Sequence, residues 1–265
     1  PLNKFKELLR SKYFVDKTML IEKINEILDT RDKFLCITKP RRFGKSSVAD
    51  MLGAYYSKAF NSEDVFNKLN ISKVNNYKEH LNKYNVIYMT LNKLPKEGNT
   101  YFDYINMIQG YLIKDITKKF PFIKAEDYYS IDDIFSATGE KFVFIIDEWD
   151  YIFSHNLFKE NQDDFLEFLR NILKDKEYVS LAYMTGVLPI KQYSTGSALN
   201  MFNEYTMLND RIYAEYFGFT EEEVKGLCSE ENSVSFKEIK EWYNGYTTNK
   251  GKSIYNPRSV VCALR

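Results

Sequence analysis

The chain has 265 residues, of which 44% are hydrophobic and 28% are charged, enough to bury a core in one large domain or two small ones. Aromatic residues make up 16% of the chain, which argues against disorder. Lys and Arg together number 37, as do Asp and Glu, so no overall electric field attracts nucleic acid or an anionic membrane.

Apolar runs alternate with segments of helical periodicity over most of the chain. In order, the pattern predicts a strand at 34–38, a helix at 48–60, a strand at 86–91, a helix at 101–119, a strand at 142–146, a helix at 163–173 and a strand at 178–184. Continuous apolar strands separated by helices are typical of a buried parallel sheet. We therefore expect an α/β fold with a mostly parallel central sheet flanked by helices.

The chain from Thr220 onward is expected to be mainly helical. Thr220 and Glu223 have the spacing of a capping box, in which two residues at a helix start bond each other's backbone amides. We therefore predict two parts, a core at residues 1–217 and a small helical lid at residues 218–265.

The loop between the first predicted strand and helix is the most informative segment. It reads Lys39-Pro40-Arg41-Arg42-Phe43-Gly44-Lys45-Ser46-Ser47. A Gly-Lys-Ser in this position is typical of a P-loop, or Walker A motif, and we take the whole segment as candidate nucleotide contacts. Lys45 is expected to bridge the β- and γ-phosphates, and Ser46 to offer its hydroxyl to Mg²⁺. One departure is Lys39, which replaces the first glycine of the usual motif.

A second motif follows the apolar run at 142–146, which ends in Asp147 and Glu148. A carboxylate at the end of a strand lies where an open α/β sheet binds ligands, so Asp147 is expected to help hold Mg²⁺, as in a Walker B motif. Glu148 is placed to act as a general base on the attacking water. The alternative is an ordinary strand end with solvated carboxylates. Asp150 is a third acid, suited either to chemistry or to a structural salt bridge.

Three further groups are candidates to interact with the γ-phosphate. Arg41 and Arg42 make the loop unusually positive. Thr185 follows the strand at 178–184 and can hydrogen-bond the γ-phosphate, although Thr185-Gly186 is also a common turn sequence. Arg211 is either an arginine finger or a surface residue.

The same tripeptide occurs a second time, as Gly251-Lys252-Ser253. No apolar strand precedes this copy, and Pro257 follows closely, so a helix starting there would be interrupted. We interpret the second copy as a polar turn.

Taken together, several motifs resemble those of the AAA-ATPase-like P-loop family, in which a basic residue at the position of Lys39 is normal. Besides the loop at 39–46, they are Phe14-Val15-Asp16-Lys17-Thr18, Ile146-Asp147-Glu148-Trp149-Asp150, Thr185-Gly186-Val187-Leu188-Pro189-Ile190-Lys191, Ser197-Ala198-Leu199-Asn200, Tyr216-Phe217-Gly218-Phe219-Thr220-Glu221-Glu222-Glu223, Trp242-Tyr243-Asn244-Gly245-Tyr246 and Tyr255-Asn256-Pro257.

The resemblance implies an ATP-binding protein of the additional-strand, catalytic-glutamate class. It also implies that residues 14–16 lie near the nucleotide and help to hold the adenine; the alternative is a plain N-terminal strand packed on the sheet. Many members carry a PD-(D/E)xK nuclease-like domain after the Tyr-Asn-Pro motif. This chain ends about eight residues past that motif, so we expect that domain to be absent or truncated.

The cysteines are isolated in sequence, and the chain has only two histidines. This argues against a disulfide framework and a zinc site, and it suits a reducing compartment. The chain start shows no signal-peptide pattern, and no apolar run approaches the length of about 20 residues that spans a bilayer. We expect a cytoplasmic protein with no membrane partner.

The sequence therefore predicts a P-loop ATPase that uses ATP and Mg²⁺ and acts on an unknown protein or nucleic-acid partner, with a homo-oligomer as one way to supply an arginine from a neighbour. The candidate catalytic residues are Lys45, Glu148, Thr185 and Arg42, and the candidate Mg²⁺ ligands are Ser46 and Asp147. Three alternatives stay open: a non-hydrolysing, ATP-gated binding module or switch; a P-loop kinase, against which Glu148 counts; and a nuclease, against which the missing metal-binding residues count.

Overall fold

The computed structural model describes residues 1–96, 98–193, 198–210, 212–231, 234–243, 245–248 and 251–265. Within these residues, five parallel strands form a central sheet in the order β2-β3-β4-β1-β5. The strands are β1 (Phe34–Thr38), β2 (Asn85–Thr90), β3 (Phe142–Asp147), β4 (Val179–Gly186) and β5 (Asn203–Tyr205). The predicted α/β fold with a mostly parallel central sheet is confirmed, and β4 lies between β1 and β3.

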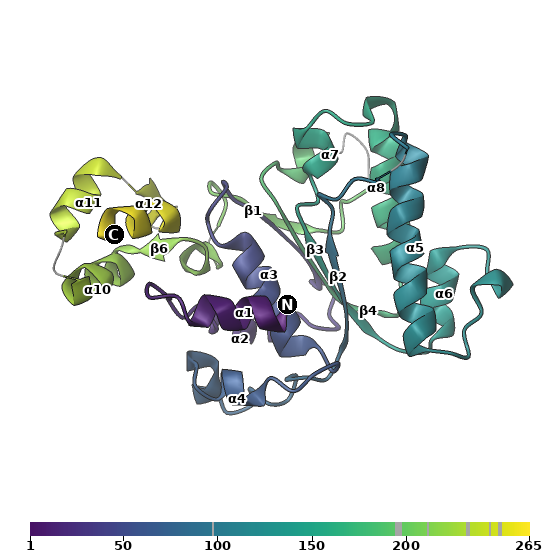
Figure 1. Cartoon of the computed structure of the whole chain (residues 1–265), viewed down its shortest axis with the longest axis horizontal. Coiled ribbons are helices and arrows are strands. Elements are labelled where there is room, and N and C mark those ends of the chain that lie inside the picture. The colour runs from purple at the N-terminus through teal and green to yellow at the C-terminus, as the bar shows by residue number, and fades with distance from the viewer. Residues whose placement is uncertain (97, 194–197, 211, 232–233, 244, 249–250) are drawn as a thin grey trace.

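Helices cover both faces of the sheet (Figure 1). On one face lie α1 (Leu2–Leu9), α2 (Leu20–Asn25), α3 (Lys45–Tyr56) and α4 (Glu63–Phe66), and on the other α5 (Tyr101–Lys119), α6 (Ile131–Ala137) and α8 (Gln162–Leu173). Shorter elements are α7 (Tyr151–Ser154), α9 (Ile190–Tyr193) and the 3-10 helices η1 (Asn70–Lys73), η2 (Ala125–Asp127), η3 (Lys159–Asn161) and η4 (Ala214–Tyr216). Alternate strand residues enter one or the other of two apolar clusters, because successive side chains point to opposite faces.

Two element boundaries matter for the site. Helix α3 begins at Lys45, earlier than predicted, because Gly44 takes a left-handed φ of 82° as its N-cap. Strand β4 continues through Thr185 and Gly186, which pair with Ile37 and Thr38 of β1. The interpretation of Thr185-Gly186 as a turn is therefore wrong. The short edge strand β5 was not predicted.

The lid segment, residues 218–265, combines helices with a small antiparallel sheet. Its described elements are β6 (Phe219–Thr220), α10 (Glu221–Glu231), α11 (Phe236–Trp242), β7 (Tyr246–Thr247), β8 (Ser253–Tyr255) and α12 (Pro257–Leu264). The expectation of a mainly helical segment did not include this sheet, since strands of two or three residues leave no period-two pattern. The capping box is confirmed, with the Glu223 amide 3.2 Å from Thr220 Oγ1 and the Thr220 amide 2.8 Å from Glu223 Oε2. The division between residues 217 and 218 stays a prediction.

None of the helices formed by the described residues combines the length and the hydrophobicity that crossing a membrane requires.

Candidate functional site

The loop after β1, the acids after β3 and the end of β4 meet at one edge of the sheet, because the carboxyl ends of parallel strands lie together. A cavity of about 560 Å³ opens there, which we call the phosphate cleft. The predicted residues that line it are Arg41, Arg42, Gly44, Lys45, Ser46, Ser47 and Glu148. Lys39, Pro40, Phe43, Asp147 and Thr185 do not line it.

The backbone around the cleft takes an uncommon conformation at three positions. Arg42, Gly44 and Glu148 have left-handed φ values of 70°, 82° and 57°. Non-glycine residues seldom adopt the left-handed region because it strains their backbone. Residues strained in this way are often found at functional sites. Gly44 leads directly into α3, a helix of 12 residues whose N-terminal amides can bind an anion.

Lys45 is buried at the N-terminus of α3, and its side chain bonds back to the start of the loop. Its Nζ donates hydrogen bonds to the carbonyl oxygens of Lys39 at 2.8 Å and Pro40 at 2.9 Å. Burial lowers the pKa of the Lys45 ammonium, and the negative charges of Asp147, Asp150 and Glu148 oppose that shift. A phosphate oxygen in the cleft would offer Lys45 a stronger, charged acceptor than these carbonyls.

Asp147 and Thr185 form a buried pair between neighbouring strands. The Thr185 hydroxyl donates a hydrogen bond to Asp147 Oδ1, and neither residue is more than 4% exposed. This bond fixes the carboxylate and leaves Oδ2 for another ligand. The exposed hydroxyl of Ser46 and this carboxylate oxygen are hard donors that fit Mg²⁺, which takes one or two protein oxygens and completes its shell with water and phosphate. Among the residues that the structure describes, the cleft included, no group of three or more His, Cys, Asp or Glu could hold a metal ion by itself.

Asp150 and Trp149 have structural surroundings. Asp150 Oδ2 accepts hydrogen bonds from the backbone amides of Val187 at 2.9 Å and Leu188 at 2.7 Å, so it holds the loop after β4. The contacts of Asp150 are therefore structural, with backbone amides in place of the salt bridge that was one alternative. Trp149 is fully buried, and its ring lies so close to Gly186 that a Cβ there would come within 2.5 Å of the indole nitrogen. Trp149 is therefore a packing residue.

Lys39 is anchored away from the cleft by residues that the sequence did not identify. Its ammonium forms an ion pair with Asp210 and donates to the Thr206 carbonyl at 3.0 Å, and both partners of the pair are 2% exposed. Burial lowers the pKa of Lys39, whereas the Asp210 charge raises it. The backbone carbonyl of Lys39, by contrast, reaches Lys45. Arg211, interpreted as either an arginine finger or a surface residue, lies outside the described residues.

The cleft also has lining residues that sequence reasoning missed, among them Asn92 and Tyr151. Asn92 follows β2 as Asp147 ends β3, so the rule that singled out Asp147 would also have found it. His155 lines the cleft as well, with its Nδ1 2.9 Å from the Tyr151 carbonyl. It lies directly after α7.

A second cavity, of about 910 Å³, lies beside the P-loop and is called here the lid pocket. Its lining includes Phe14 and Val15 from the N-terminal segment, Gly44 and Ser47 from the P-loop region, and Pro257 from the lid segment. Residues 14–16 form no strand. The alternative of an N-terminal strand packed on the sheet is therefore wrong.

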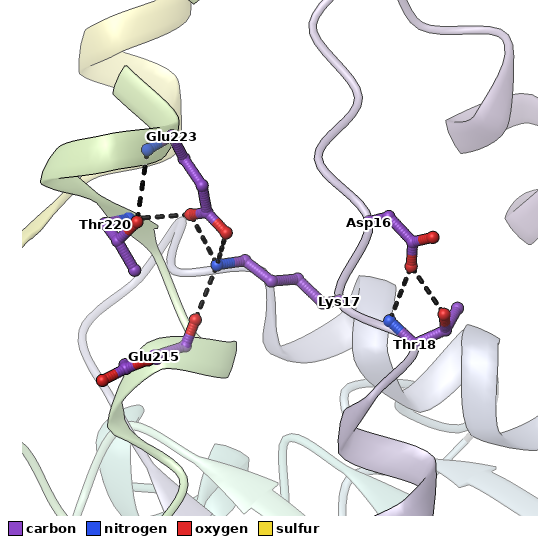
Figure 2. Close-up of polar contacts among 6 residues, drawn as sticks. All are labelled: Asp16, Lys17, Thr18, Glu215, Thr220 and Glu223. Atoms are coloured by element: carbon purple, nitrogen blue, oxygen red, sulfur yellow. Dashed lines mark hydrogen bonds and ion pairs between the residues drawn. The ribbon is translucent and has the colours of Figure 1, made fainter. Parts of the chain in front are cut away.

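Polar contacts tie the N-terminal segment to the lid segment at this pocket (Figure 2). Lys17 Nζ lies 2.6 Å from both carboxylate oxygens of Glu223 and 2.6 Å from the Glu215 carbonyl. On the other side, Asp16 Oδ1 accepts from the Thr18 amide at 2.8 Å and its hydroxyl at 2.6 Å. The Lys17 ion pair thus joins the segment that precedes α2 to the first turn of α10.

The P-loop itself also contacts the lid segment. The Gly218 amide donates to the Phe43 carbonyl at 3.1 Å, and the Phe43 ring meets the Tyr246 ring edge-on with centroids 5.3 Å apart. Asn256 Nδ2 donates to the Arg41 carbonyl at 3.4 Å. A change in the P-loop backbone would therefore reach the lid segment directly.

Comparison with known proteins places the chain in a family. A family model described as a predicted AAA-ATPase matches residues 2–195, which include the P-loop and the strands β1 to β4. No curated protein matches the chain. A nucleotide-binding role agrees with the geometry of the cleft, and because the match spans well over half of the sequence, the chain belongs to the AAA-ATPase-like family.

Proposed function

We propose that this protein binds MgATP in the phosphate cleft and hydrolyses it. The observation that carries the proposal is the convergence of Lys45, the Asp147–Thr185 pair and Glu148 at one edge of the sheet. Family membership supports nucleotide binding, whereas the chemistry rests on these side chains.

The phosphates would bind at the N-terminus of α3. Lys45 would exchange its bonds to the Lys39 and Pro40 carbonyls for bonds to phosphate oxygens. The exposed side chains of Arg41 and Arg42 add positive charge at the cleft, where the γ-phosphate would lie. Ser46 and Asp147 would hold Mg²⁺, which neutralises phosphate charge when bound.

Hydrolysis requires a base and an aligned water. Glu148 lines the cleft beside these groups, and its carboxylate can take a proton from water as the water oxygen attacks the γ-phosphorus. The bond from the γ-phosphorus to the bridging oxygen then breaks, and ADP and inorganic phosphate leave. The Thr185 hydroxyl donates its hydrogen bond to Asp147 Oδ1, so we assign Thr185 to positioning Asp147.

The lid pocket would take the nucleoside. It adjoins the P-loop at Gly44 and Ser47, and Phe14, Val15 and Tyr216 offer it apolar surface for a base. ATP would then touch the core, residues 1–217, and the lid, residues 218–265, at once. Hydrolysis would change how the two parts meet and so act on a protein or nucleic-acid partner.

The free cysteines, two of them buried, suit a protein of the reducing cytoplasm.

The test separates binding from turnover. ATP affinity by calorimetry and phosphate release with Mg²⁺ would be measured for the wild type, for Glu148→Gln and for Glu160→Gln, an exposed glutamate outside the cleft. We expect Glu148→Gln to keep its affinity and lose about 100-fold or more in turnover, and the control to keep both. A wild type that binds ATP without turnover would favour the non-hydrolysing switch, and one that binds no ATP would refute the proposal.

A further inference from the structure

The outer edge of β2 carries backbone groups that no strand of the described chain uses. Strand β2 pairs with β3 on one side and is the last strand of the sheet on the other. The Leu91 amide donates to the Asp147 carbonyl at 3.1 Å, so the N–H group of Leu91 points toward β3. Since successive residues of a strand point their N–H and C=O groups to opposite sides, those of Val86, Tyr88 and Thr90 point outward.

The chain already places one short extended segment on this edge. Just before β2, the Tyr84 amide donates to the Tyr56 carbonyl at 2.9 Å, and the Lys58 amide donates to the Tyr84 carbonyl at 2.8 Å. Ser57 thereby forms a single parallel bridge with Tyr84. The pairing stops there, although the same outward-facing pattern continues along β2.

The open edge lies in a groove rather than on a flat surface. A cavity of about 540 Å³, called here the edge groove, is lined by every residue of β2. Met107 and Tyr111 of α5 form its wall on one face of the sheet, and Asp50 of α3 with Lys4 of α1 forms the wall on the other. A strand laid in the groove would therefore send alternate side chains toward the α5 wall, which also carries Asp115 and Lys119, and toward the wall with Asp50 and Lys4.

Two buried acceptors in the groove lack donors. Asp50 Oδ1 and Asn85 Oδ1 are buried and have no hydrogen-bond partner, in residues that are 8% and 3% exposed. The Lys4 ammonium and the Tyr88 hydroxyl face the Asp50 carboxyl and oppose the rise of its pKa, but neither gives Oδ1 a hydrogen bond. No ion pair within 4.0 Å engages Asp50 among the residues that the structure describes. Buried acceptors are rarely left unpaired in folded proteins, so this wall favours an incoming donor.

We propose that the edge groove binds an extended peptide segment of a partner protein, which adds to β2 as a further strand and directs a Lys or Arg side chain toward Asp50. Outward N–H and C=O groups supply the backbone hydrogen bonds, as in other cases of strand addition. Residues of the peptide on either side of the basic one pack against Met107 and Tyr111. The inference concerns a face separate from the phosphate cleft and does not depend on ATP turnover.

The first test is a selection with a displayed library of random decapeptides on the whole chain, counter-selected on Val86→Pro. Proline at residue 86 removes an outward N–H and suits an edge strand, and Val86→Thr is the matched control that keeps it. We expect the selected peptides to alternate apolar residues with a Lys or Arg. As synthetic peptides, they should lose about tenfold or more in affinity for Val86→Pro and several-fold for Asp50→Asn, with no loss for Val86→Thr. The proposal would be overturned if the selection enriched no peptides that prefer the wild type to Val86→Pro. It would also be overturned if the selected peptides bound Asp50→Asn as tightly as the wild type.

Amide exchange of the wild type with a selected peptide gives a second test, which holds even if Val86→Pro does not fold. The peptide should slow exchange of the Val86, Tyr88 and Thr90 amides about tenfold or more, and leave Ile87 and Met89 unchanged, because the latter already face β3. Protection elsewhere on the protein, or on the inward set alone, would refute strand addition.

Discussion

The tripeptide Gly-Lys-Ser occurs at 44–46 and again at 251–253, and both glycines have left-handed backbones, with φ of 82° and 72°. The first copy follows β1 and begins α3, whereas the second follows β7 and ends at Ser253, the first residue of β8. Lys45 is 8% exposed and bonds two backbone carbonyls of its own loop. Lys252 is 54% exposed and pairs with Glu215 at 2.5 Å.

The difference shows what turns a short motif into a phosphate site. A strand that delivers the loop to the edge of the sheet and a helix whose amides face the anion are needed in addition to the three residues. The second copy follows only the two-residue strand β7 of the small antiparallel sheet and leads into β8, not into a helix. Its interpretation as a polar turn agrees with the bond from the Gly251 amide to the Thr248 carbonyl, 2.9 Å long.

The largest expected effect concerns the ion pair beside each copy. Lys39–Asp210 is 2% exposed on both sides, whereas Lys252–Glu215 is 54% and 48% exposed. Asp210→Ala leaves a buried ammonium without its partner, so the free energy of unfolding should fall by about 3–5 kcal/mol. Glu215→Ala should cause no measurable loss, because exposed pairs contribute little. Urea denaturation of both variants checks this, and equal losses would contradict it.

The next effect is on nucleotide affinity. Lys45→Ala should weaken MgATP binding by about ten- to a hundredfold, since a charge-assisted bond to phosphate contributes about 1.5–3 kcal/mol. Lys252→Ala should bind as the wild type does. Calorimetric titration of both variants makes the comparison, and a loss of affinity in Lys252→Ala would mean that the second copy also contacts nucleotide.

The two glycines allow a finer comparison. A Cβ at Gly44 or Gly251 meets nothing within 4 Å, so alanine at either position is opposed mainly by the left-handed backbone. Each substitution should lower the free energy of unfolding by about 1–2 kcal/mol. Only Gly44→Ala should also weaken MgATP binding, because only there does the backbone face the phosphate cleft. Unequal losses of stability would show that one loop relaxes its backbone.

The smallest expected effect is on the pH dependence of stability, and it comes from Asp50. This residue lies in α3, the helix that begins within the first copy. Burial raises the pKa of Asp50, while the nearby Lys4 cation opposes the shift. Between the unfolded pKa and this raised value, the folded protein keeps a proton that the unfolded chain has lost. The contribution of Asp50 to stability is therefore full at low pH and is lost as pH rises through the raised pKa.

Asp50→Asn removes this dependence. The melting temperature of the variant minus that of the wild type should therefore increase as the pH rises from 4 to 7. The exposed Asp115, also on the edge groove, gives the matched control Asp115→Asn, whose difference from wild type should stay constant. A constant difference for Asp50→Asn would contradict the prediction.

The buried strands and the longest helix were predictable because their sequences carry continuous signals. The strand at 34–38 and the helix at 101–119 match β1 and α5 residue for residue. The edge strand β5 reads Asn-Glu-Tyr, which has no apolar run, and it exists because it pairs with β1. Short strands stabilised by their neighbours cannot be found from local pattern.

The residues of the candidate site also divide into those that a local sequence pattern identifies and those that only tertiary contacts reveal. Lys45, Asp147 and Glu148 were found because each follows or ends a recognisable strand. Asp210 was missed because its partner Lys39 lies 171 residues earlier in the chain, and no local pattern joins the two. The bond from Thr185 to Asp147 likewise depends on β3 and β4 being neighbours, so the positioning role of Thr185 could not be read before the strand order was known.

The chain has two tryptophans, and the fold gives them opposite surroundings. Trp149 follows Glu148 directly and is fully buried, whereas Trp242, at the end of α11, is 81% exposed. A soluble quencher such as iodide would therefore suppress the emission of Trp242 and spare that of Trp149. The remaining fluorescence is a label-free optical signal from a residue next to the phosphate cleft, and the quenched part is one from the lid segment.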